Sequence, residues 1–178
     1  MKRGEKGKTR SPVLVVEDEA AQRQTLTDIL EAEGLDSICC GTGKEALEIC
    51  QRQDVIVVIL DLRLPDMDGL ELLSRLKQHN PEIKAIINTG YASLESAMAA
   101  VNYEAFAYVR KMDDVEELLG HVHLAFHTHL SLYSEKLEQE VRKRTAELSR
   151  ANTALEQEIS ERRQAEAALR ESERRYQQ

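Results

Sequence analysis

The chain has 178 residues, which suffices for one domain with a well-buried core plus an extended segment, but not for two full globular domains. Aromatic residues make up only 4% of it and Trp is absent, which favours a core of Ala, Leu, Val and Ile over a β-sandwich. The net charge of −8 excludes a chain that as a whole binds nucleic acid by counterion release.

No apolar run approaches the ~20 residues of a membrane span, and none follows the basic N-terminus as a signal peptide would require. We therefore expect a cytoplasmic protein with no membrane or nucleic-acid partner. Residues 1–11 are rich in Lys and Arg and predict a disordered arm. Cys39, Cys40 and Cys50 lack the spacing of a zinc or disulfide site, so we expect reduced thiols that pack as small apolar core residues.

Short apolar runs alternate with amphipathic patterns up to Gly120, and all Gly and Pro residues lie at or before that position. The apolar runs predict five strands, at Val13–Val16, Ile38–Cys40, Val55–Leu60, Ala85–Ile87 and Phe106–Val109. Apolar residues at three- and four-residue spacings predict a helix after each strand, at Ala20–Ala32, Lys44–Arg52, Leu70–His79, Ser93–Val101 and Val115–His127. This order predicts an α/β fold, a doubly wound five-stranded parallel sheet.

Four of these strands end in polar or charged residues. Glu17 and Asp18 follow the first strand, Asp61 the third, Thr89 the fourth and Lys111 the fifth. Ligands of open parallel sheets bind beyond the carboxyl ends of the strands. Exposure to solvent explains a polar residue at any one strand end, but the agreement of four strands favours a binding site.

Clustered carboxylates repel one another unless a cation lies among them, and several hard oxygen ligands suit Mg²⁺. Glu17, Asp18 and Asp61 supply such oxygens. Lys111 adds a compact positive charge, and the Thr89 hydroxyl is a further donor to phosphoryl oxygens. The sequence therefore predicts phosphoryl transfer with an aspartate as nucleophile.

Four motifs resemble the receiver domain of bacterial two-component response regulators, over roughly residues 12–127. They are V-V-E-D-E after the first strand, I-L-D-L-R-L-P-D-M-D-G-L around the third, N-T-G-Y-A-S after the fourth and F-A-Y-V-R-K in the fifth. The resemblance implies a flavodoxin-like (βα)5 fold. It also implies that Asp61 is the phosphoacceptor and that a partner histidine kinase or phosphotransfer protein supplies the phosphoryl group.

The resemblance further assigns the residues that hold Mg²⁺. Asp18 and Asp61 would bind it directly, Glu17 through a metal-bound water, and Arg63 through its backbone carbonyl. No organic cofactor is implied.

The resemblance assigns the remaining site residues to the phosphoryl group and the switch. Lys111 and Thr89 would contact the phosphoryl oxygens, and Tyr108 would turn inward when Thr89 moves toward the phosphate. One position departs from the family, because Met112 stands where a Pro, often in a cis bond, usually follows the lysine. We expect a trans Lys111–Met112 bond, since cis bonds without Pro are costly.

Residues 128–178 contain no helix breaker and predict a helical connector. One seven-residue series is apolar except for Arg162, as in one edge of a coiled-coil seam; its apolar members are Val141, Leu148, Leu155, Leu169 and Tyr176. Asn152 on the neighbouring series favours a parallel two-stranded arrangement, so we expect a homodimer through this segment. A single, highly charged helix is the alternative.

The final segment, E-I-S-E-R-R-Q-A-E-A-A-L-R-E-S-E-R-R-Y, resembles the connector that precedes a PAS sensor domain, often in sensor histidine kinases. We therefore expect an output domain after Gln178.

Four histidines near the start of the connector, at positions 121, 123, 127 and 129, invite a metal site. The 121/123 and 127/129 pairs are two residues apart and point to different helix faces, although 123 and 127 share a face. Polar positions on the outgoing helix are the better interpretation.

We expect a regulatory phosphoacceptor rather than an enzyme, with at most self-catalysed phosphotransfer and autodephosphorylation. Two alternatives remain. A Mg²⁺-dependent aspartyl-phosphate phosphohydrolase typically needs a second Asp two residues after the nucleophile, where this chain has Arg63. A phosphorylation-independent pseudo-receiver that serves as a dimerisation scaffold is opposed by the carboxylates, Thr89 and Lys111.

Overall fold

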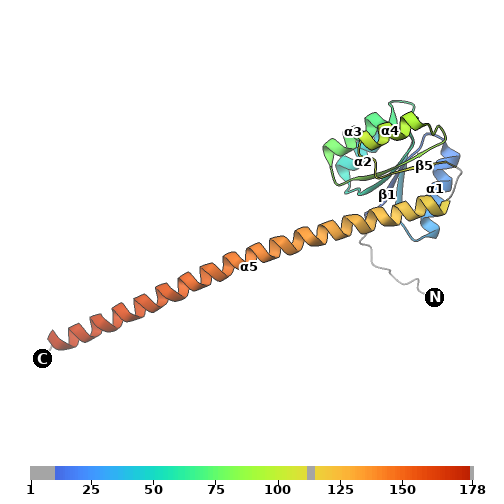
Figure 1. The fold of residues 1–178 in the computed structure, drawn as a ribbon. Helices are drawn as coiled ribbons and strands as arrows, with labels where there is room; N and C mark the ends of the chain where they lie inside the picture. Colours follow the sequence, from blue (N-terminus) through green and yellow to red (C-terminus); the bar gives the residue numbers. More distant parts are fainter. Residues whose placement is uncertain (1–10, 112–114, 177–178) are drawn as a thin grey trace, which may run out of the picture. The chain divides into compact units, whose positions relative to one another are not determined.

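The computed structural model of the chain describes residues 11–111 and 115–176, with side chains as far as residue 166. The five strands are β1 (Val13–Val16), β2 (Ser37–Cys40), β3 (Val57–Leu60), β4 (Lys84–Thr89) and β5 (Ala107–Arg110). The helices are α1 (Ala20–Ala32), α2 (Gly43–Arg52), α3 (Gly69–His79), α4 (Leu94–Asn102) and α5 (Val115–Tyr176) (Figure 1).

The strands form one parallel sheet in the order β2-β1-β3-β4-β5. The order reverses next to β1, whose Val15 pairs with Cys39 of β2 on one side and with Ile59 of β3 on the other. This is the flavodoxin-like arrangement, so the predicted fold class is confirmed. Sheets of this kind bind ligands at the switch point, which here lies between the carboxyl ends of β1 and β3.

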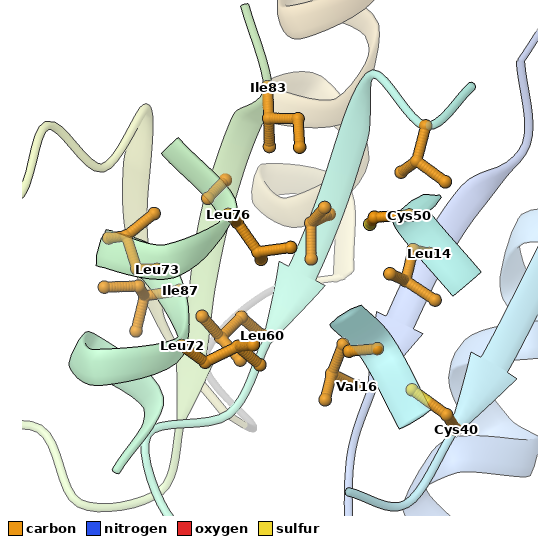
Figure 2. Packing of buried hydrophobic residues seen from close by; sticks show 14 of the residues in the cluster. Leu14, Val16, Cys40, Cys50, Leu60, Leu72, Leu73, Leu76, Ile83 and Ile87 are labelled. Carbon is orange, nitrogen blue, oxygen red and sulfur yellow. The ribbon is translucent and has the colours of Figure 1, made fainter. Parts of the chain in front are cut away.

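Alternate residues of the central strands are buried on opposite faces of the sheet, because successive side chains of a strand point to opposite sides. Leu14 of β1 and Leu60 of β3 lie in the cluster covered by α2, α3 and α4 (Figure 2). The helices contribute mainly leucines to it, Leu72, Leu73 and Leu76. Val15 and Ile59 face the other cluster, which α1 covers with Leu30 and the first turns of α5 cover with residues such as Val122.

The ends of several elements differ from the sequence prediction, most of them by one residue and those of β3 and β4 by two. β3 begins at Val57 rather than Val55, because Val55 is buried but stands before the first ladder pair, Val57 with Lys84. β4 runs on to Thr89, since Asn88 and Thr89 continue the ladder with β5.

The prediction that all three cysteines are core residues was wrong for Cys39. Cys40 and Cys50 are buried, whereas Cys39 is exposed. The reason is its place on β2, which lies at the edge of the sheet, so that the neighbour of a buried strand residue there faces solvent.

The chain divides into two compact units, Met1–Leu130 and Ser131–Gln178. The predicted long C-terminal helix is confirmed, since α5 runs through to Tyr176. No helix within the described residues is long and apolar enough to cross a membrane. The predictions for the N-terminal arm and for the Lys111–Met112 bond concern residues 1–10 and 112, which lie outside the described residues.

Candidate functional site

The site lies at the switch point of the sheet, where β1 and β3 end side by side. Two backbone hydrogen bonds extend the ladders past the strand ends: the N–H of Asp61 donates to the carbonyl of Val16 at 3.0 Å, and that of Glu17 donates to the carbonyl of Cys40 at 3.1 Å. The sheet therefore fixes the main chain of both acidic residues.

Three carboxylates gather there, from Glu17, Asp18 and Asp61, with oxygens that lie within 4.8 Å of one another. Glu17 and Asp61 are buried, with 2% and 6% exposure, whereas Asp18 is open to solvent. No other group of three potential metal-binding side chains is found among the described residues. Oxygen donors of this kind and charge fit Mg²⁺, and the exposed Asp18 leaves a side from which an ion can enter.

Lys111 joins the two buried acids. Its ammonium nitrogen lies 2.6 Å from Oδ2 of Asp61 and 2.6 Å from Oε2 of Glu17. The side chain is 13% exposed, and its backbone N–H donates to the carbonyl of Thr89 at 3.0 Å. The lysine is thus held by β4 and aimed at the carboxylate of Asp61.

Burial dominates the electrostatics of the acidic turn, which consists of Glu17, Asp18 and Glu19 after β1. It raises the pKa of Glu17 above the ordinary 4.5, and the hydrogen bond and positive charge of Lys111 only partly offset that rise. For Lys111 burial acts to lower the pKa, but the bonds to Asp61 and Glu17 outweigh it and raise the pKa above 10.5. The ammonium group is therefore charged at neutral pH.

The loop after Asp61 packs closely against the start of α3, and only glycine fits at that contact. A Cβ on Gly69 would lie 2.4 Å from the carbonyl oxygen of Asp61 and 2.6 Å from the Cα of Leu62, both of which are backbone atoms. The N–H of Gly69 donates to the carbonyl of Leu62 at 2.8 Å. Gly69 therefore sets how α3 meets the strand that carries Asp61.

Arg23 of α1 holds the acidic turn from outside. Its Nη1 donates to the carbonyl oxygens of Glu17 at 2.5 Å and Asp18 at 3.1 Å. These bonds fix the main chain on which two of the three carboxylates stand. Sequence reasoning missed this residue, because its only signal is a basic side chain one helical turn into α1.

The two predicted switch residues are joined to other partners. Thr89 is fully buried, and its Oγ1 accepts a hydrogen bond from the N–H of Tyr91 at 3.3 Å. The hydroxyl of Tyr108 is half-buried and lies 2.8 Å from Oγ of Ser96, which belongs to the capping box of α4. Neither Tyr91 nor Ser96 was identified from the sequence, since both contacts depend on tertiary structure.

Arg63 lies beside Asp61, two residues further along the chain. Its backbone N–H lies 3.3 Å from Oδ1 of Asp61, and its exposed guanidinium stacks on the ring of Tyr91, 3.5 Å from the centroid. The structure thus places six of the seven predicted site residues at or just beyond the carboxyl ends of β1, β3, β4 and β5, and Tyr108 within β5. It brings Glu17, Asp18, Asp61 and Lys111 into one cluster.

Comparison with known proteins agrees with this arrangement. The family model of the response regulator receiver domain matches residues 13–123. The DNA-binding transcriptional regulator NtrC of Escherichia coli K12 is 35% identical over 127 residues, which are 71% of this chain and 26% of that protein. The chain therefore spans about a quarter of the length of this curated relative.

Solved structures give the same result. A CheY-like response regulator receiver domain protein from Methanospirillum hungatei JF-1 superposes with a TM-score of 0.66 at 31% identity, over 69% of this chain and 98% of that one. The beryllofluoride-activated NtrC4 receiver domain dimer superposes with a TM-score of 0.63 at 31% identity, over 66% and 98% of the two chains.

Proposed function

The chain belongs to the response regulator receiver domain family, and from that premise we propose that it accepts a phosphoryl group on Asp61 in a Mg²⁺-dependent reaction. The donor is a partner histidine kinase or phosphotransfer protein. The observation that carries this proposal is the buried Asp61 carboxylate, which has two acids of the β1 turn within 4.8 Å and the Lys111 ammonium at 2.6 Å.

The charges of the cluster call for a divalent cation. Three carboxylates and one ammonium leave an excess of negative charge that a phosphoryl dianion would increase. Asp18 and Asp61 would hold Mg²⁺ directly, Glu17 through a water, and Arg63 through its carbonyl. When bound, the ion supplies positive charge against the transferring oxygens.

The reaction on the protein side is a displacement at phosphorus. A carboxylate oxygen of Asp61 forms the new P–O bond while the P–N bond of the donor phosphohistidine breaks, and the imidazole leaves with the electron pair and takes up a proton. Lys111 already lies at the acceptor oxygen, so its charge requires little reorganisation when the phosphoryl group arrives. Thr89 contributes its hydroxyl after it releases the N–H of Tyr91.

That release provides the switch. Thr89 and Tyr108 stand on neighbouring strands, and each is bonded in this structure to the segment around the start of α4. When the Thr89 hydroxyl moves to the phosphoryl group, Tyr108 exchanges its bond with Ser96 for a buried position. Phosphorylation thus shifts a population between two arrangements of α4 and β5.

The output runs through α5, which we propose forms a parallel, two-stranded coiled coil. Within residues 131–166 the described apolar side chains of the seven-residue series are more than half exposed in one chain, with 56% for Val141, 66% for Leu148 and 56% for Leu155. A second copy would cover them and place two receivers at the same end of the dimer. We propose that the signal passes along this seam to an output domain of the kind that a PAS connector precedes, in the cytoplasm where the kinase partner acts.

This role is regulatory, with self-catalysed phosphotransfer and autodephosphorylation rather than turnover of a substrate. Incubation of the full chain with Mg²⁺ and acetyl phosphate, followed by intact mass measurement, tests it. We expect one phosphoryl adduct, which should not form when Mg²⁺ is chelated beforehand and should be absent from Asp61→Asn. No adduct on the wild-type chain would favour the scaffold, and rapid consumption of phosphoester substrates would favour a phosphohydrolase.

A further inference from the structure

Two residues outside the carboxylate cluster are linked across the mouth of the site. Arg63 stands two positions after Asp61, and Tyr91 stands two positions after Thr89. Each donates its backbone N–H back to the side chain of that site residue, to Asp61 Oδ1 and to Thr89 Oγ1, both at 3.3 Å. Their own side chains then stack, with the guanidinium carbon 3.5 Å from the ring centroid.

The stack therefore ties together two loops at the mouth of the site. It joins the loop after β3 to the loop after β4, although Tyr91 is 63% exposed and has no core packing to hold it there. Tyr91 in turn keeps the Thr89 hydroxyl occupied through its N–H. The contact that holds Tyr91 at Arg63 therefore also restrains the loop that follows Thr89.

We propose that Arg63 and Tyr91 form a latch that holds the receiver in its unphosphorylated arrangement. The arrival of the phosphoryl group opens this latch. The inference rests on the proposed phosphorylation of Asp61. A guanidinium stacked on an exposed ring gains only a small cation–π attraction. A phosphoryl dianion two residues away offers the same guanidinium charge-assisted, bidentate hydrogen bonds, which are the stronger interaction.

The order of events follows from the contacts. Arg63 turns from the ring to the phosphoryl oxygens, Tyr91 loses its partner, and its N–H releases the hydroxyl of Thr89. The latch thus makes Arg63 the residue that senses the new charge and Tyr91 the residue that passes the change to the β4–α4 loop.

Hydrogen exchange of the unphosphorylated full chain tests the latch without any phosphate. We expect Arg63→Ala and Tyr91→Ala each to speed exchange of the amides at 89–93 roughly two- to five-fold, which is the range that a surface cation–π contact supports. The double variant should exchange no faster than either single variant, because both remove one contact. Tyr91→Phe keeps the ring and should match the wild-type chain.

The rate of phosphorylation gives the second readout. With Mg²⁺ and acetyl phosphate, Tyr91→Ala should acquire the adduct roughly two- to five-fold faster than the wild-type chain, while Tyr91→Phe should not. Tyr103→Ala, which removes another exposed tyrosine at the end of α4, is the matched control and should leave both readouts unchanged.

The outcomes separate the latch from the proposed function. Effects of Arg63→Ala and Tyr91→Ala that add in full, or a Tyr91→Phe that behaves as Tyr91→Ala, would overturn the latch even where the adduct forms normally. A wild-type chain that takes no adduct would refute phosphorylation of Asp61, and the exchange measurement would still decide whether the stack restrains the loop.

Discussion

The ammonium nitrogen of Lys111 lies at the same distance, 2.6 Å, from a carboxylate oxygen of Asp61 and from one of Glu17. One cation thus neutralises two buried acids that come from different strands. The lysine thus places one positive charge against the Asp61 carboxylate, which offsets part of the cost of burying it. This relationship also makes the lysine important for stability, in addition to its proposed part in phosphoryl transfer.

Replacement of Lys111 by Met should destabilise the Mg²⁺-free chain by on the order of 2 kcal/mol, because it leaves two buried carboxylates without their cation. Mg²⁺ should then raise the unfolding temperature of the variant more than that of the wild-type chain, since the ion can take over the neutralising role. Thermal unfolding with and without Mg²⁺ measures both effects. Lys143→Met, at an exposed position of α5, is the control; an equal response of the two variants to Mg²⁺ would contradict the assignment.

The raised pKa of Glu17 predicts a pH dependence of stability in Mg²⁺-free buffer. Because the folded chain holds this proton more tightly than the unfolded chain, the stability from Glu17 is fully present below its ordinary pKa of 4.5 and is lost as the pH rises through the folded value. The free energy of unfolding of the wild-type chain should therefore fall, relative to that of Glu17→Gln, as the pH rises from 4.5 toward neutrality. Urea unfolding across this range measures the difference.

Glu48→Gln, at an exposed position of α2, controls for the loss of a carboxylate. A difference between Glu17→Gln and the wild-type chain that stays constant with pH would show that Lys111, and not burial, determines the titration of Glu17. The raised pKa of Lys111 affects stability at alkaline pH. Its contribution to the free energy of unfolding is complete below the ordinary pKa of 10.5 and is lost as the pH rises through the pKa of the folded chain.

Gly69→Ala should destabilise the chain by about 1–3 kcal/mol, because its Cβ would meet backbone atoms of Asp61 and Leu62 that cannot move independently. Gly120→Ala is the matched control, since a Cβ there meets nothing within 4 Å and α5 is helical around it. It should stabilise the chain by about 0.5–1 kcal/mol. Chemical unfolding of both variants checks the pair, and a harmless Gly69→Ala would mean that the β3–α3 loop does not depend on this contact.

Changes on the seam of α5 should dissociate the proposed dimer. Leu148→Glu combined with Leu155→Glu places charges on the seven-residue series and should give the mass of a single chain in light scattering. Ala146→Glu combined with Thr153→Glu adds the same charge on another face of the helix and should leave the dimer intact. A wild-type chain with the mass of a monomer at all concentrations would instead support the single charged helix.

The sequence was sufficient to predict the fold because the apolar runs that mark buried strands alternate along the chain with amphipathic helical patterns. Val13–Val16 is apolar at every position, and the structure covers both of its faces, so the strand and its place in the sheet follow from composition. Reliance on apolar character also explains why the predicted start of β3, at Val55, was wrong. Val55 is buried like a strand residue, yet burial does not show whether a residue pairs in the ladder.

The charged residues of the site could be predicted from the sequence, but the tertiary contacts around them could not. Asp61 and Lys111 are typical of their family at recognisable positions, and the parallel topology alone brings them to one edge. The stack of Arg63 on Tyr91 joins residues of two loops whose approach no local pattern encodes. Arg23 likewise donates hydrogen bonds to backbone carbonyls. Because every residue has such a carbonyl, the sequence of the acidic turn does not indicate this contact.

The central claim is that Asp61 carries the phosphoryl group, and reduction of the phosphorylated chain with borohydride tests it most directly. Borohydride converts an acyl phosphate to an alcohol, so tandem mass spectrometry should find homoserine in place of Asp61 after treatment with Mg²⁺ and acetyl phosphate. The unphosphorylated chain should show aspartate there. Homoserine at Asp18, or a phosphoryl group retained on a Ser, Thr or His after reduction, would contradict the assignment of Asp61.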